Sequence, residues 1–367
     1  MLSPRPAIRT LPAYHPPLAG RDGLRLDFNE NTVGCSPRVL ARLHQMTAEN
    51  LARYPEREPV EQKVAEFLGV SPPELLLTNG VDEAIHLLCQ TYLEPGDEAL
   101  IVVPTYSMYR IYMMAAGAQV ITVPAGNDFQ FSSDVLCTRI TPRTRLIAIA
   151  NPNNPTGSIT RCEDLLQIAD SAPDAALLVD EAYFEFYGQT LLPKCTKLPN
   201  LFVARTFSKA YGMAGLRVGA LVGNSAQMQV VRHVSSPYNV NAAALVCLPE
   251  AIADQTFIRE YVREIIASRA SLESALEANG IQFWPSHANF VLARVAPDRN
   301  GATAFVKHMH QRGILVRDRS SDQGCEGCVR FTLGPRAHTK RLLTALQEVF
   351  NEAAFKEFGA VQGAARS

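Results

Sequence analysis

The chain has 367 residues, of which 47% are hydrophobic and 19% are charged, proportions that are typical of a globular protein of one or two domains. Its 35 Lys and Arg residues nearly balance 36 Asp and Glu residues, which argues against a nucleic-acid partner. No apolar run approaches the roughly 18 residues that span a membrane, so we expect no membrane partner. Eight scattered cysteines indicate reduced thiols, so we expect a cytoplasmic protein.

The first 24 residues contain five prolines, which predict an irregular arm. A polar segment at 26–31 follows as a short strand or loop. Helices are expected at 37–45, where Ser36 can cap the first turn, and at 59–67.

From residue 75 onward, short apolar runs alternate with helical patterns. These runs show no alternation of apolar and polar residues, which is typical of strands that are buried on both faces of a parallel or mixed sheet. We therefore predict an α/β domain with a mostly parallel central sheet covered by helices. The expected strands are 75–78, 99–103, 119–123, 146–150, 176–179, 201–204 and 218–222.

A long amphipathic helix at 254–279 is expected to lead into a smaller α+β domain. Its expected strands are 281–284, 289–294, 314–316 and 329–333, and its helices are 302–312 and 335–352. Cys325 and Cys328 form one close pair without a second pair, so no metal site is predicted.

Four parts of the chain are distinguished on this basis. Residues 1–40 form the arm and part of the small domain, and 41–260 form the large domain. Residues 261–356 form the small domain, and 357–367 a frayed tail.

Lys209 follows the expected strand 201–204 and has an unusual set of neighbours, the hydroxyls of Thr206 and Ser208 and the guanidinium of Arg217. A single lysine is usually a solvated surface charge. A lysine amine is also the nucleophile for carbonyl cofactors, and hydroxyls with a bidentate arginine suit a phosphate dianion. We expect a Schiff-base lysine beside a phosphate site.

Other polar groups also follow buried strands, where ligands bind in α/β sheets. Asp180 ends the run 176–179 and could pair with a protonated pyridine nitrogen, or simply cap a helix. Asn154 lies in a loop that two prolines and a glycine make rigid. The segment 80–83 begins a helix whose N–H groups could bind an anion. Tyr106 could stack on a planar ring, although such a tyrosine is more often part of the core.

These segments resemble the pyridoxal-5′-phosphate aminotransferases of fold type I, in the aspartate aminotransferase superfamily. Within it the chain is most similar to the histidinol-phosphate aminotransferases. The resemblance extends from about Tyr14 to Leu346, and the order and spacing of its motifs are specific to the superfamily. The motifs are LDFNEN, RYPE, TNGVDEAI, PTYSMYR, NPNNPTG, VDEAY, RTFSKAYGMAGLRVG, SPYNVN, ANFVL, GILVRD and VRFTLG.

The resemblance implies roles around the cofactor ring. Lys209 would bond covalently to the cofactor and later move a proton between the substrate and cofactor carbons. Asp180 would hold the ring-nitrogen proton, and Tyr183 and Asn154 would hydrogen-bond the ring oxygen. Tyr106 would stack on the ring.

The resemblance also implies a set of groups that hold the cofactor phosphate. One of them would come from a second subunit, which implies a homodimer with shared active sites. The set comprises the backbone at Val81 and Asp82, the side chains of Thr206, Ser208 and Arg217, and Tyr54 of the neighbouring subunit.

Substrate specificity is expected to depend on Arg330, which most aminotransferases use for an α-carboxylate. Histidinol phosphate has no carboxylate, so Arg330 would take its phosphate, with Arg317 as a second partner. Arg317 could instead be a rim charge beside Asp318. Asn29 and Tyr14 would belong to the arm that closes over the substrate.

The reaction expected is histidinol phosphate with 2-oxoglutarate, in histidine biosynthesis. Alternatives within the superfamily are an aromatic amino-acid aminotransferase and a threonine-phosphate decarboxylase. An inactive, cofactor-binding regulator would have a broken site, whereas Lys209, Asp180, Asn154 and Arg217 are all present.

Overall fold

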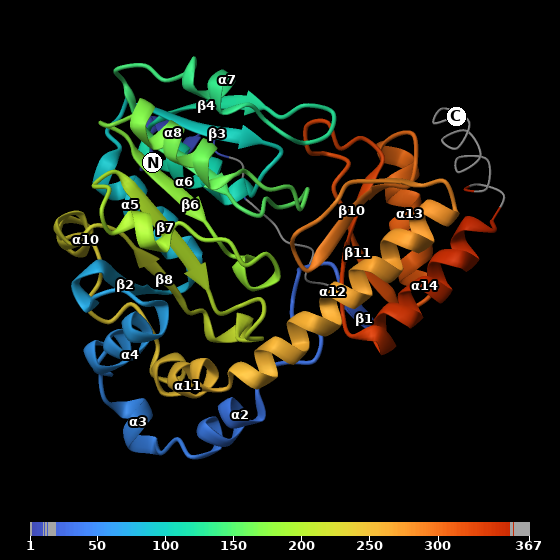
Figure 1. Cartoon of the computed structure of the whole chain (residues 1–367), viewed down its shortest axis with the longest axis horizontal. Helices are drawn as coiled ribbons and strands as arrows, with labels where there is room; N and C mark the ends of the chain where they lie inside the picture. The colour runs from blue at the N-terminus through green and yellow to red at the C-terminus, as the bar shows by residue number, and fades with distance from the viewer. Residues whose placement is uncertain (1, 10, 12, 14–19, 353–354, 356–367) are drawn as a thin grey trace.

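The computed structural model describes residues 2–9, 11, 13, 20–352 and 355. Its strands form two sheets, one of seven strands in the order β2-β8-β7-β6-β5-β3-β4 and one of five in the order β1-β11-β12-β10-β9. The two sheets lie in separate bodies that the long helix α12 (Gln255–Ala278) connects (Figure 1). Within the described part of the chain, no helix is long and apolar enough to cross a membrane.

The seven-stranded sheet confirms the prediction of a mostly parallel arrangement. Neighbouring strands from β4 across to β7 pair in parallel, whereas β8 runs antiparallel to both β7 and β2. The strands are β2 (Leu75–Thr78), β3 (Glu98–Val103), β4 (Gln119–Pro124), β5 (Thr144–Ala150), β6 (Ala176–Asp180), β7 (Leu201–Thr206) and β8 (Gly219–Val222). Every residue of β2, β6, β7 and β8 is buried, which explains their continuous apolar sequences.

Helices cover both faces of this sheet. Leu178 of β6 packs in a cluster with residues of α5 (Gly80–Tyr92), α6 (Ser107–Ala116) and α10 (Ser225–Arg232). Leu177, its neighbour in sequence, points to the opposite face, because successive side chains of a strand alternate. On that face lie α4 (Glu58–Leu68), α8 (Cys162–Ser171) and α11 (Ala242–Ala253).

The five-stranded sheet includes the first strand of the chain. β1 (Leu24–Leu26) pairs in parallel with β11 (Ile314–Asp318), so residues near the N-terminus belong to the second body. The other elements are β9 (Gln282–Phe283), β10 (Phe290–Arg294), β12 (Cys328–Thr332), α13 (Arg299–Gln311) and α14 (Arg336–Phe350). The domain boundary predicted at residue 260 falls inside α12 and stays a prediction.

The arm is not wholly irregular, which corrects the expectation for residues 1–24. Pro6–Arg9 forms the short helix α1, whose first residue is a proline. Proline is tolerated there because the first N–H groups of a helix have no partner within it. Arg5 fixes the segment to α6 by donating from Nη2 to the carbonyl oxygen of Ala115 at 2.7 Å.

The remaining short helices connect the larger elements. They are α2 (Pro37–His44), α3 (Ala48–Ala52), α7 (Ser133–Cys137) and α9 (Leu192–Cys195). The side chain of Ser36 accepts a hydrogen bond from the N–H of Arg38, as expected of the cap of α2.

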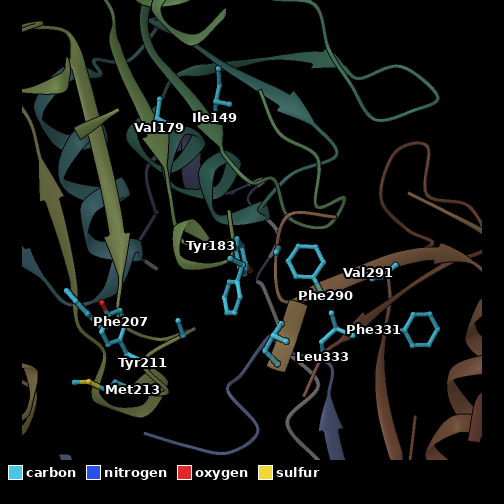
Figure 2. Packing of buried hydrophobic residues seen from close by; sticks show 14 of the residues in the cluster. Ile149, Val179, Tyr183, Phe207, Tyr211, Met213, Phe290, Val291, Phe331 and Leu333 are labelled. Atoms are coloured by element: carbon cyan, nitrogen blue, oxygen red, sulfur yellow. The ribbon is translucent and has the colours of Figure 1, made fainter. Parts of the chain in front are cut away.

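Apolar packing joins the two bodies. Figure 2 shows Tyr183, which follows β6, beside Phe290 of β10. Their rings meet edge to face with centroids 5.2 Å apart, and both side chains are buried. The second body is therefore fixed against the carboxyl edge of the large sheet.

A close backbone contact also determines the shape of this edge. A Cβ added to Gly219, at the start of β8, would lie 2.8 Å from the carbonyl oxygen of Arg205 and 3.0 Å from the carbonyl carbon of Gly80. Only glycine permits this approach between β8, β7 and the first turn of α5.

We expect Gly219→Ala to destabilise the protein by about 1–3 kcal/mol, because the added methyl group forces the backbone apart. A lower urea midpoint of unfolding would report the change. Gly215→Ala is the matched control, since its added Cβ has open space around it. Equal midpoints for the two variants would contradict the prediction.

Candidate active site

A cavity of about 410 Å³ lies at the carboxyl ends of the parallel strands, next to the second body. It brings together predicted site residues that come from six separate segments of the sequence. Those that line it are Val81, Asp82, Tyr106, Asn154, Asp180, Tyr183, Thr206, Ser208, Lys209 and Arg217. Among the described residues, no group of three or more His, Cys, Asp or Glu side chains could hold a metal ion.

Lys209 projects from the loop after β7. Its Nζ donates a hydrogen bond to the carbonyl oxygen of Phe28 at 3.1 Å, so the amine contacts the segment that follows β1. Burial lowers its pKa to about 8, and the positive charges of Arg330 and Arg217 act in the same direction. A larger share of the amine is therefore neutral and nucleophilic at physiological pH than in an ordinary lysine.

Asp180 is the last residue of β6, and its carboxylate is held by two hydrogen bonds. The Tyr109 hydroxyl donates to Oδ2 at 2.6 Å, and the N–H of Ala182 donates to Oδ1 at 3.0 Å. Burial raises the pKa of Asp180 to about 6, although both hydrogen bonds oppose this rise. The side chain is thus a buried acceptor that is mostly charged at neutral pH.

Another part of the cavity wall is formed by the start of α5. Gly80 has φ +74°, and a Cβ there would lie 2.7 Å from Nη2 of Arg217, so glycine is needed for the arginine to approach. That Nη2 atom donates to Oδ2 of Asp82 at 3.1 Å. The Tyr106 hydroxyl donates to Oδ1 of the same carboxylate at 2.8 Å. A helix N-terminus and an arginine together favour an anion.

Thr206 and Ser208 line the cavity beside Lys209. Both residues are nearly buried, and the N–H of Ser208 donates to the Thr206 hydroxyl at 3.1 Å. The two hydroxyls therefore line the same cavity as Arg217.

Arg330 of β12 does not itself line the cavity, but it connects the two bodies through Asn154, which does. Its Nη1 donates to Oδ1 of Asn154, and its Nη2 donates to the carbonyl oxygen of Asp27 at 2.6 Å. Burial lowers the pKa of Arg330 to about 9, with Arg319 as the next cause. Its Nε is buried and has no hydrogen-bond partner among the described residues. A buried guanidinium with an unused N–H donor can bind a further anion.

Asn29 lies directly behind the cavity wall. It has φ +56°, a left-handed conformation that asparagine tolerates better than most residues, and its Nδ2 donates to the Tyr183 hydroxyl at 2.8 Å. Burial raises the pKa of Tyr183, although Arg330 and this hydrogen bond act against the rise. Tyr183 is therefore a neutral hydroxyl that faces the cavity.

The other predicted site residues lie elsewhere. The guanidinium of Arg317 lies 5.3 Å from the ring centroid of Phe28, which itself lines the cavity. Tyr54 is 77% exposed and lines a different hollow, between α3, α4 and α11. Tyr14 lies outside the described residues.

The sequence analysis missed several residues of the cavity. Tyr109 is three positions after Tyr106 in α6, and this helical spacing could have identified it as a second tyrosine on the same side. Arg21, Arg25, Phe28 and Glu30 also line the cavity. Nη2 of Arg21 lies 2.7 Å from Oδ1 of Asp27, and its Cζ lies 4.1 Å from the Phe28 ring centroid. No sequence motif predicts these contacts.

The chain belongs to the class I and II aminotransferases. The family profile described as "Aminotransferase class I and II" matches residues 21–346, which include both bodies and every residue of the cavity. The fold type I architecture predicted from the motifs is thus confirmed.

Relatives within this family cover nearly the whole chain. A histidinol-phosphate aminotransferase of Roseobacter denitrificans is 36% identical and covers 94% of this chain and 98% of its own. One of Caldanaerobacter subterraneus is 35% identical, over 89% and 93% of the two chains. A crystal structure of a histidinol-phosphate aminotransferase from Sinorhizobium meliloti, in complex with pyridoxal-5′-phosphate, superposes with a TM-score of 0.87 at 27% identity, over 94% and 96% of the two chains.

The lowered pKa of Lys209 predicts an unusual pH dependence of its reactivity. With a pKa of about 8, a much larger fraction of the amine is neutral at pH 7 than in an ordinary lysine. Acylation of Lys209 in carbonyl-free protein should therefore fall as the pH drops through about 8. Pulse labelling with acetic anhydride and peptide mass spectrometry would measure it, with the exposed Lys63 as internal reference.

Arg330→Ala provides the control for this experiment. Removal of a positive charge that lowers the pKa of Lys209 should move the midpoint to higher pH. A midpoint near 10 in the unaltered protein would contradict the electrostatic description of the site.

Proposed function

We propose that this chain is a pyridoxal-5′-phosphate-dependent aminotransferase that converts histidinol phosphate and 2-oxoglutarate into imidazole acetol phosphate and glutamate. The reaction would serve histidine biosynthesis in the cytoplasm. One observation carries the proposal: a lysine amine with a lowered pKa and a buried carboxylate share one cavity with an arginine at a helix N-terminus. The names of the relatives support the choice of substrate.

When bound, pyridoxal 5′-phosphate supplies an aldehyde that bonds to amines and a pyridine ring that withdraws electrons from the substrate. Asp180 would accept a hydrogen bond from the protonated ring nitrogen and keep that proton in place. Tyr109 supports this role, because its hydrogen bond favours the charged form of Asp180. Tyr183 and Asn154 would orient the ring through its oxygen, and Tyr106 would pack on its face.

The start of α5 would bind the cofactor phosphate. Backbone N–H groups at Val81 and Asp82 lie at the positive end of the helix, and Thr206, Ser208 and Arg217 line the same cavity. In the present arrangement Arg217 is paired with the Asp82 carboxylate, so a phosphate dianion would exchange with or share this partner.

Lys209 would act as the proton carrier once the substrate amine has replaced its own. The neutral amine would take a proton from the α carbon of the substrate and deliver it to the aldehyde-derived carbon of the cofactor. A pKa of about 8 suits both steps, because the group can accept and release a proton near neutral pH.

The positive charge around Arg330 supports a phosphorylated substrate. Arg319 and Arg317 both lower the pKa of Arg330, which means that they raise the local positive potential. A phosphate dianion gains more from several guanidinium groups than a single carboxylate does. Arg330 and Arg317 would thus bind the phosphate, and the arm with Asn29 and Tyr14 would cover the remainder of the substrate.

We further propose a homodimer in which Tyr54 of one subunit reaches the cofactor phosphate of the other. The position of Tyr54 supports this arrangement, since its side chain is exposed and lies outside the cavity of its own chain. An amino donor and a 2-oxo acid would bind alternately, as a ping-pong mechanism requires.

The first test is spectroscopic. Protein loaded with pyridoxal 5′-phosphate should absorb visible light, and Lys209→Ala should lack the lysine-linked band while it still binds the phosphate. A colourless loaded protein would contradict the whole proposal. Turnover of histidinol phosphate, phenylalanine and threonine phosphate should then differ, with histidinol phosphate giving the highest kcat/KM. Preference for phenylalanine, or release of carbon dioxide from threonine phosphate, would select one of the alternatives.

Arg330→Ala should lower kcat/KM for histidinol phosphate by the equivalent of about 1.5–3 kcal/mol, because a charged set of hydrogen bonds is lost. Steady-state kinetics would measure the loss. Arg330→Lys is the matched control, since it keeps the charge and removes the bidentate geometry. An unchanged kcat/KM in the alanine variant would remove Arg330 from the substrate site.

A further inference from the structure

Two exposed tyrosines stack on each other at the surface. Tyr54 lies in the loop between α3 and α4, and Tyr238 in the loop between α10 and α11. Their ring centroids are 4.2 Å apart at an interplanar angle of 24°. The two side chains are 77% and 56% exposed in the single chain. A stacked pair restricts the rotamers of both rings before any ligand arrives.

The two loops are also fixed to each other by hydrogen bonds. Nη1 of Arg57 donates to Oδ1 of Asn239 at 2.6 Å, and more weakly to the carbonyl oxygen of Ser236 at 3.5 Å. Each loop therefore contributes one aromatic ring and one polar anchor. These hydrogen bonds fix the two loops, and therefore the two stacked rings, relative to each other.

Asn239 also connects the two loops to the proposed cofactor site of its own subunit. Nδ2 of Asn239 donates to the carbonyl oxygen of Leu77 in β2 at 2.9 Å and to Glu83 in the first turn of α5 at 2.7 Å. Glu83 also accepts from the N–H of Asn79, which immediately precedes α5. The segment with Tyr54 and Tyr238 is thus attached to the helix that would bind this subunit's phosphate.

We propose that Tyr238 is a positioning residue, which holds the Tyr54 ring in the orientation that contacts the cofactor phosphate of the partner subunit. The inference rests on the proposed cofactor and homodimer. The physical reason is preorganisation: a ring that is already ordered loses less conformational freedom when it binds. Tyr238 would thereby act on the cofactor site of the partner subunit, whose lysine belongs to that partner.

Tyr238→Ala should raise the Kd for pyridoxal 5′-phosphate by about 2- to 10-fold, the change that corresponds to the loss of one aromatic pair. Tyr238→Phe keeps the stack and should keep the affinity of the unaltered protein. Equilibrium dialysis of each loaded dimer would measure Kd. Tyr238→Leu, which keeps apolar bulk without a ring, gives the same comparison if the alanine variant does not fold.

A double-mutant cycle separates positioning from a general structural effect. Tyr54→Phe removes the hydroxyl that would bind phosphate, so Tyr238→Ala in that background should change Kd less than 2-fold. A second, multiplicative loss would mean that Tyr238 acts by another route and would overturn the proposal.

Hybrid dimers test whether the effect crosses between subunits. Two differently tagged chains, one with Lys209→Ala and one with Tyr238→Ala, would be co-expressed and the hybrid purified. Only one of its sites carries Lys209, and that site would receive Tyr54 from the subunit with intact Tyr238. Its lysine-linked visible band should therefore decay on dilution at the rate of the unaltered dimer. Decay as fast as in the Tyr238→Ala homodimer would overturn the proposal.

Failure of the inference can be distinguished from failure of the proposed function. If the unaltered dimer binds pyridoxal 5′-phosphate and Tyr238→Ala binds it equally well, only the role of Tyr238 is overturned. If the unaltered protein does not bind the cofactor, the proposed function fails together with the inference.

Discussion

Burial of charged side chains at one edge of the large sheet is the constraint on which the site depends. Burial is the largest cause of the pKa shift at three charged groups of the cavity region, bringing Lys209 to about 8, Asp180 to about 6 and Arg330 to about 9. In each case the low-dielectric surroundings favour the neutral form. The fold creates this setting because β6 and β7 run in parallel, with Asp180 beside Ala204, so that their following loops meet.

Hydrogen bonds and neighbouring charges then determine how readily Asp180 and Lys209 keep their charges. Asp180 keeps its charge at neutral pH because Tyr109 and the N–H of Ala182 both stabilise the carboxylate. Lys209 has a backbone carbonyl as its partner, and neighbouring arginines disfavour its positive charge. One environment therefore yields a charged acceptor and an amine that loses its proton more readily than an ordinary lysine does, which is the division of roles that a lysine-bound carbonyl cofactor needs.

The sequence was sufficient for the strands and for much of the cavity. A strand that is buried on both faces leaves an apolar run, and a polar residue at its end or in the loop that follows lies at the carboxyl edge, as Asp180 and Asn154 do. Contacts between distant segments left no such signal. The pairing of Arg21 and Arg317 with the Phe28 ring, and the bond from Tyr109 to Asp180, depend on how the second body and α6 pack. Helix α1 was not predicted, because proline interrupts the interior of a helix. Pro6 is instead the first residue of α1, a position that proline favours.

The arginines of the second body concentrate positive charge beside the cavity. Arg317 stands opposite Arg330 on neighbouring antiparallel strands, an arrangement of like charges that destabilises a sheet. Asp322 offsets this repulsion in part, and Arg319 adds to it. A bound phosphate dianion would relieve the repulsion. Arg330 also donates to Asn154, which lies 176 residues away in the sequence. A phosphate bound to Arg330 would therefore also affect Asn154, the side chain that would orient the cofactor ring. In the proposed function, binding of the substrate anion and alignment of the ring would therefore be coupled through one guanidinium group.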